Sequence, residues 1–124
     1  DCCHLILRGG SDGPNYDRET VGAASKALKE KGYTPRLMVD CSHGNSNKDH
    51  RKQPAVVKEV ASRIKEGEHS IFGLMLESNL VEGRQNYEEG KELTYGQSIT
   101  DACMGWDDTI PALEELAHAV ANRN

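Results

Sequence analysis

Three polar residues with reactive side chains each follow a short apolar run. Arg8 follows the run in HLILRGG, His43 lies just past the run in LMVDCSHGNSNKDH, and Glu77 follows the run in SIFGLMLES. Enzymes built on parallel strands take their active-site residues from the carboxyl ends of several strands. The repeated placement therefore predicts one assembled site that contains all three side chains.

The residue types at these positions indicate a metal ion beside an anion. His43 and Glu77, together with Asp101 farther along, offer an imidazole and two carboxylates, which suit a divalent Mn, Fe, Co or Zn ion. His43 can also carry a proton, and the planar fork of Arg8 can bind phosphate or carboxylate oxygens at two points. Other roles stay open. His43 could be a surface-loop histidine without a function, Arg8 and Glu77 could form salt bridges, and Asp101 could cap a turn.

Other polar and sulfur-containing residues give weaker signals. Lys48, Glu82 and Arg84 are candidates for substrate contacts, although solvated loop charges are the commoner explanation. The four cysteines, at positions 2, 3, 41 and 103, lack the CxxC spacing of a zinc ribbon, so we expect reduced thiols. We expect Cys41 and Cys103 to be small buried residues rather than metal ligands.

Turn residues and apolar periodicity divide the chain into three strand and helix units. The expected elements are a strand at 4–7, a helix from about 18 to 31, a strand at 36–40, a helix from about 53 to 65, a strand at 70–76 and a last helix after 107–109. A long loop over 79–96 follows the third strand, and loops of this length are usually functional. This βαβαβα order predicts an α/β fold with parallel strands and right-handed crossovers.

The last helix has its own sequence signals. We expect Asp107, Asp108 or Thr109 to cap its first turn, which would also contain Pro111. The apolar spacing predicts a buried face with these members: Leu113, Leu116, Ala117 and Val120. This face would pack the helix onto the rest of the domain.

Three units are too few to close a barrel, which needs eight. We therefore interpret residues 1–124 as the last three βα units of a (β/α)₈ TIM barrel, a partial domain of a longer enzyme whose N-terminal half is absent. The start at Asp1 without a methionine fits this expectation. A flavodoxin-like or Rossmann domain is disfavoured, because no G-x-G-x-x-G turn follows the first strand.

Composition excludes several classes of protein. The 124 residues carry a net charge of −5 with no basic stripe, which argues against nucleic-acid binding. No apolar segment approaches the roughly 20 residues that cross a bilayer, and we expect no secretory leader. We expect a cytoplasmic protein with no membrane partner.

The motifs together resemble a known enzyme family. CHLILRGG, GPNYD, LMVDCSHGNSNKDHRKQP, GLMLESNLVEGRQ and LTYGQSITDACMGWDDT occur in collinear order along the whole chain. They resemble the C-terminal part of a type I 3-deoxy-D-arabino-heptulosonate 7-phosphate (DAHP) synthase. That resemblance implies a barrel enzyme that condenses phosphoenolpyruvate with erythrose 4-phosphate in the first step of the shikimate pathway to the aromatic amino acids.

The resemblance also implies roles for the candidate residues. His43, Glu77 and Asp101 would be three of four protein ligands of the divalent metal, His43 would also help with catalysis, and Arg8 would hold the phosphate of phosphoenolpyruvate. The fourth ligand, a cysteine on an early strand, and the lysine-proline-arginine-threonine segment are absent from this chain. We therefore expect the full-length protein to be an active homo-oligomer and the isolated chain to be inactive. The alternatives are a non-catalytic assembly module and another metal-dependent phosphosugar aldolase-type barrel.

Overall fold

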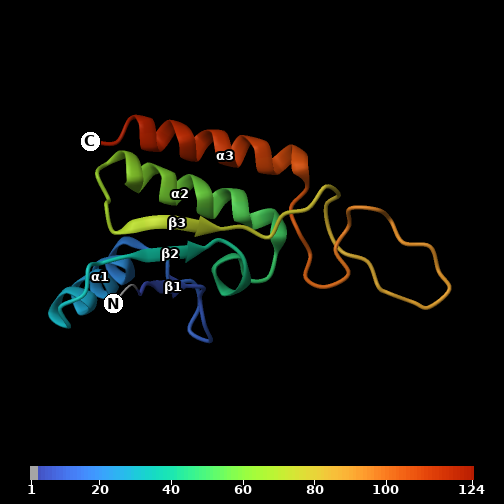
Figure 1. Ribbon diagram of the computed structural model, residues 1–124, viewed down its shortest axis with the longest axis horizontal. Coiled ribbons are helices and arrows are strands. Elements are labelled where there is room, and N and C mark those ends of the chain that lie inside the picture. Colours follow the sequence, from blue (N-terminus) through green and yellow to red (C-terminus); the bar gives the residue numbers. More distant parts are fainter. Residues whose placement is uncertain (1–2) are drawn as a thin grey trace.

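The computed structural model describes residues 3–124 and has an α/β architecture (Figure 1). Its strands and α-helices are, in chain order, β1 (Leu5–Leu7), α1 (Arg18–Glu30), β2 (Leu37–Asp40), α2 (Gln53–Lys65), β3 (Ile71–Met75) and α3 (Trp106–Ala121). The strands form one parallel sheet in the order β1-β2-β3. The predicted alternation of strands and helices and the parallel sheet are therefore confirmed, with strands one or two residues shorter than expected.

The two faces of the sheet differ in exposure because successive strand residues point to opposite sides. Leu7 pairs with Val39 across β1 and β2, and both side chains are buried in the core. The next pair along the register, Ile6 and Met38, points the other way, and Ile6 is 46% exposed. One face of the sheet thus carries the helices and the other is open.

Local sequence signals explain where the first two helices begin and end. The carboxylate of Asp17 accepts a hydrogen bond from the backbone N–H of Thr20 and caps α1. Gly32 and Gly67 lie just past α1 and α2 with φ of +80° and +106°, a conformation that glycine adopts without steric cost. Both helices therefore end next to the glycines that were predicted to terminate them.

The start and the packing of α3 differ from the prediction. The N-cap is Gly105, so Asp107 and Asp108 lie inside the first turn, where they complement the helix dipole, and Pro111 lies in the second turn. Of the predicted face, Leu116 is partly buried against the core, whereas the fully buried residues of α3 are small: Thr109, Ala112 and Ala119. Leu113 and Val120 are 49% and 54% exposed. The reason is that α3 packs beside α2 (Figure 1), and small side chains allow the two helices to approach closely.

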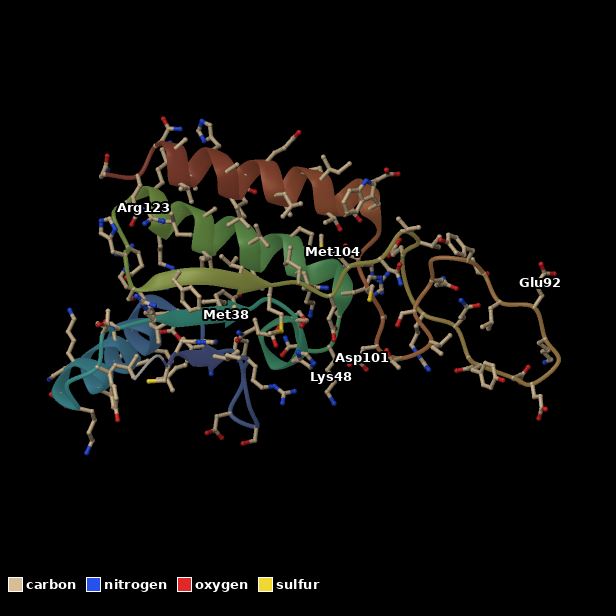
Figure 2. The ribbon with its side chains drawn as sticks, in the orientation of Figure 1. Met38, Lys48, Glu92, Asp101, Met104 and Arg123 are labelled. Atoms are coloured by element: carbon tan, nitrogen blue, oxygen red, sulfur yellow. The ribbon has the colours of Figure 1, made fainter. Side chains whose placement is uncertain are left out.

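The segment between β3 and α3 has no regular secondary structure and projects from the sheet, with Glu92 near its far tip (Figure 2). Side-chain bonds brace it: Gln85 Nε2 donates to the carbonyls of Thr94 and Gln97, and Gln97 Nε2 donates to the carbonyl of Glu82. The predicted long loop is therefore present and holds a defined conformation. No helix in residues 3–124 is long and apolar enough to span a membrane.

The cysteines in the described part of the chain, Cys3, Cys41 and Cys103, are free thiols. Cys41 is fully buried and Cys103 is partly buried. These three cysteines form no disulfide with one another, while Cys2 lies outside the described residues.

Candidate metal and anion site

The predicted site residues gather around a single cavity at the carboxyl edge of the sheet. The cavity has a volume of about 610 Å³ and is lined by Arg8, His43, Ser46, Lys48, His50, Glu77, Arg84, Thr100, Asp101 and Ala102. All four predicted site residues belong to this lining, and so do Lys48 and Arg84. Figure 2 shows Lys48 and Asp101 on the same side of the molecule. Residues up to 93 positions apart in the sequence, Arg8 and Asp101, therefore share one cavity.

Three of these side chains converge closely enough to hold a metal ion. His43, Glu77 and Asp101 each offer a ligand atom, and these atoms all lie within 4.8 Å of one another. The Nε2 atom of His43 is 3.4 Å from Glu77 Oε1 and 3.9 Å from Asp101 Oδ2. One imidazole nitrogen with two carboxylate oxygens is a donor set that Mn, Fe, Co and Zn accept.

The electrostatics of Glu77 are those of a crowded acidic site. Partial burial raises the pKa of Glu77 above its ordinary value; the His43 imidazole acts in the opposite direction, and the Asp101 and Asp40 carboxylates raise it further. A bound cation would relieve the repulsion between these carboxylates. The charge arrangement therefore fits the metal-binding interpretation of the donor set.

A buried glutamine fixes the backbone of Glu77. Gln53, the first residue of α2, is completely buried; its Nε2 donates to the carbonyl of Glu77 at 2.9 Å and its Oε1 accepts from the N–H of Glu77 at 2.8 Å. The N–H of Met104 donates to the same carbonyl at 3.0 Å. These bonds tie the end of β3 to α2 and to the segment before α3.

A second set of contacts joins the loops that carry Arg8 and His43. Gly9, with φ of +75°, lies against Gly44, and a Cβ on Gly9 would lie 2.5 Å from the carbonyl carbon of Gly44. Asn45 Nδ2 donates to the carbonyls at the ends of both strands, Leu7 at 2.9 Å and Asp40 at 2.8 Å. Sequence analysis missed Gln53 and Asn45, whose partners lie 24 and 38 positions away.

On one side of the cavity lie positively charged side chains that have no carboxylate partner among the residues that the structure describes. No carboxylate in residues 3–124 lies within ion-pair distance of Arg8 or Lys48, so the alternative of an Arg8 salt bridge is not observed there. Lys48 has a left-handed backbone, with φ of +58°, and its N–H donates to the carbonyl of His43 at 2.8 Å. The Nε of Arg84 donates to the carbonyl of Thr100 at 2.7 Å. Positively charged side chains next to the cluster of His43, Glu77 and Asp101 suit an anionic ligand beside a metal ion.

Comparison with known proteins identifies the family of this chain. Residues 1–114 match the model of the DAHP synthetase I family. The chain belongs to this family. It is 50% identical over 121 residues to phospho-2-dehydro-3-deoxyheptonate aldolase of Haemophilus influenzae, an alignment that covers 98% of this chain and 33% of that protein.

Two further relatives of the family give the same picture. The phenylalanine-inhibited phospho-2-dehydro-3-deoxyheptonate aldolase of Saccharomyces cerevisiae is 52% identical over 126 residues, covering 96% of this chain and 34% of that protein. The structure of phospho-2-dehydro-3-deoxyheptonate aldolase from Francisella tularensis SCHU S4 superposes with a TM-score of 0.92 at 48% identity, covering 98% of this chain and 35% of the other. This chain therefore spans about a third of the length of these relatives.

Proposed function

We propose that this chain is part of a DAHP synthase, a metal-dependent enzyme that condenses phosphoenolpyruvate with erythrose 4-phosphate to give DAHP and phosphate. The observation that carries this proposal is the convergence of His43, Glu77 and Asp101 within 4.8 Å of one another, in a cavity that Arg8 also lines. Family membership and the names of the relatives support the same activity. The pathway is then the shikimate route to the aromatic amino acids, in the cytoplasm.

The proposed whole enzyme is a (β/α)₈ barrel, and residues 1–124 supply its last three βα units. The open three-stranded parallel sheet supports this architecture, since a barrel needs further strands on both edges. The 610 Å³ cavity lies at the carboxyl edge of the strands, where barrel enzymes place their active sites. We further propose that the full-length protein is a homo-oligomer.

Each candidate residue has a chemical task in this reaction. His43, Glu77 and Asp101 would hold a divalent Mn, Fe, Co or Zn ion, which when bound supplies Lewis acidity toward the aldehyde of erythrose 4-phosphate. Arg8 binds the phosphate of phosphoenolpyruvate through its planar fork. A new bond forms between C3 of phosphoenolpyruvate and the aldehyde carbon, water adds at C2, and phosphate leaves by C–O cleavage. His43 would take part in catalysis through the ion that it holds, since its Nδ1 bonds to Asp40 and its Nε2 faces the other two ligands.

The isolated 124-residue chain should not turn over. It offers three clustered metal donors and an incomplete barrel, and metal affinity depends on a complete ligand set. Product formation by the purified chain, alone and joined to the remainder of the protein, tests this directly. Robust turnover by the chain alone would contradict the proposed division of the active site.

Substitutions in the full-length protein test the residue roles. His43→Gln should remove both bound metal and product formation, while Arg8→Ala should raise the KM for phosphoenolpyruvate and leave bound metal unchanged. His118→Gln, on the exposed last turn of α3, is the matched control and should behave like the unsubstituted protein. Unchanged turnover and metal content in His43→Gln would refute the assignment.

A second candidate function is a non-catalytic assembly module, and the exposed apolar surface favours it. Ile6 and Phe72 of the sheet are 46% and 51% exposed, and Leu113 of α3 is 49% exposed. Unpaired strand edges invite association. Light scattering of the chain, alone and mixed with the remainder of the protein, distinguishes self-association from assembly into a barrel, and only the assembled barrel should gain turnover.

A further inference from the structure

The strongest unassigned feature of the molecule is a buried carboxylate behind the proposed metal ligand His43. Asp40, the last residue of β2, is only 2% exposed, and its Oδ2 lies 2.8 Å from Nδ1 of His43. Its other oxygen, Oδ1, accepts from the backbone N–H of Ser42 at 2.9 Å and from the Ser42 hydroxyl at 2.5 Å. A buried charged group needs such partners, and every partner here belongs to the segment that carries His43.

The geometry points to Asp40 as the positioning residue that sets the tautomer and aim of His43. This inference rests on the proposed metal site, and it assigns Asp40 no contact with substrate. A carboxylate at 2.8 Å from Nδ1 accepts a hydrogen bond only if that nitrogen carries a proton. Nε2 of the neutral ring is then left with a free lone pair directed at Glu77 and Asp101, as a metal ligand requires.

The backbone of His43 explains why such a hold is needed. His43 begins a 3₁₀ helix, His43–Ser46, and has φ of +51°, a backbone conformation that residues other than glycine rarely adopt. The bonds of Asp40 to the N–H of Ser42 and to the His43 ring bridge this turn from both sides. Asp40 therefore fixes the strained turn and the ring orientation together.

The Ser42 N–H makes Asp40→Asn an informative substitution. That N–H donates to Oδ1, so in the variant it should hold the amide oxygen at this position and leave the amide NH₂ facing Nδ1 of His43. An NH₂ donor there pairs only with an unprotonated Nδ1, and the Ser42 hydroxyl, 2.9 Å from Nδ1, can also donate to that nitrogen, so the ring proton should move to Nε2. The variant keeps the hydrogen bond within the turn but takes the lone pair of Nε2 away from the metal.

Two measurements on the full-length protein test the proposal. The first is the ¹⁵N NMR spectrum of metal-free protein labelled in its histidine rings, with His43 assigned through His43→Gln. We expect the proton of the unsubstituted His43 ring on Nδ1 and that of Asp40→Asn on Nε2. Finding Nε2–H in the unsubstituted protein would overturn the proposal, and this measurement needs no variant of Asp40 that folds.

The second measurement is Mn²⁺ and Co²⁺ affinity by competition with a chelator. Asp40→Asn should bind both ions about 10- to 100-fold more weakly, and excess metal should restore its kcat. Asp49→Asn is the matched control, because Asp49 caps the neighbouring 3₁₀ helix His50–Lys52 without touching His43, and it should bind metal normally. Equal affinity in Asp40→Asn and the unsubstituted protein would mean that Asp40 has only a structural role.

These readouts also separate this inference from the proposed function. If the full-length protein makes no DAHP but shows the Nδ1–H tautomer and the weakened metal binding of Asp40→Asn, the positioning role stands and the proposed reaction fails. If the protein makes DAHP while His43 carries its proton on Nε2, the reaction stands and the role of Asp40 fails.

Discussion

Replacing Asn45 with alanine should loosen the junction between the two loops that carry Arg8 and His43. The Asn45 side chain is 3% exposed and makes hydrogen bonds to three backbone groups. Its Nδ2 donates to the carbonyls of Leu7 and Asp40 at 2.9 and 2.8 Å, and its Oδ1 accepts from the N–H of Asn15 at 2.8 Å. Alanine removes all three bonds and adds no strain to the backbone.

The expected loss of stability follows from these contacts. A buried hydrogen bond contributes about 1 kcal/mol net, so the removal of three predicts a free energy of unfolding lower by about 3 kcal/mol. The loss would be greater if the carbonyls of Leu7 and Asp40 stayed dry and unpaired. With a urea m-value of about 1–3 kcal/mol/M, the midpoint of unfolding should fall by about 1–3 M.

Urea unfolding followed by circular dichroism measures this change. Asn122→Ala is the matched control: Asn122 is exposed at the end of α3, where its Nδ2 makes one bond to the His118 carbonyl at 2.8 Å, and its loss should cost less than about 1 kcal/mol. The full-length Asn45→Ala protein should also show a raised KM for phosphoenolpyruvate, because Arg8 loses its fixed position. An Asn45→Ala protein as stable as the control would refute the reasoning.

Three further predictions concern other parts of the fold. Hydrogen bonds from the Thr20 hydroxyl and N–H hold the pKa of Asp17 below its ordinary value of 3.8, so the carboxylate stabilises the fold above that pH. Asp17→Ala should therefore lower the free energy of unfolding by about 1 kcal/mol at pH 7. Urea unfolding should show that the difference between the two proteins disappears as the pH falls through the folded-state pKa of Asp17. A difference that persists at low pH would contradict this. Burial raises the pKa of Cys41 to about 12, so a thiol reagent at pH 8 should modify Cys41 only after unfolding, as mass spectrometry of the native and urea-unfolded protein can check. Gln53→Ala should weaken Mn²⁺ binding by releasing the backbone of Glu77, and unchanged binding in a chelator competition would show that the two bonds are dispensable.

Strands and crossover helices could be predicted from the sequence because their signals are local. The predicted bounds of α2, 53 to 65, are the observed ones, since glycine terminates the helix and proline lies in its first turn. The packing of α3 could not be predicted, because hydrophobicity favours the face with Leu113 and Val120. The small side chains of Ala112 and Ala119 face α2 instead, and only the position of the neighbouring helix decides between these faces.

The candidate site was predictable where its residues follow strands. Arg8, His43 and Glu77 each come just after an apolar run, and parallel strands bring such positions to one edge. The residues that hold them in place gave no such signal. Asn45 reaches a carbonyl 38 positions away and Gln53 one 24 positions away, and such pairs exist only once the sheet has formed.

The buried polar residues at the carboxyl edge explain how irregular loops can present a precise set of ligand atoms. Metal and phosphate sites require their donors to be held to within roughly 0.5 Å, which exposed loops do not achieve by themselves. Asp40, Asn45 and Gln53 are buried, and each bonds to at least two groups of the loops or strand ends that carry His43, Arg8 or Glu77. The fold tolerates the burial of these polar groups only because their hydrogen bonds are satisfied. The loss of one partner should therefore displace a ligand atom as well as destabilise the fold, so metal affinity and stability should fall together in substitutions of these residues.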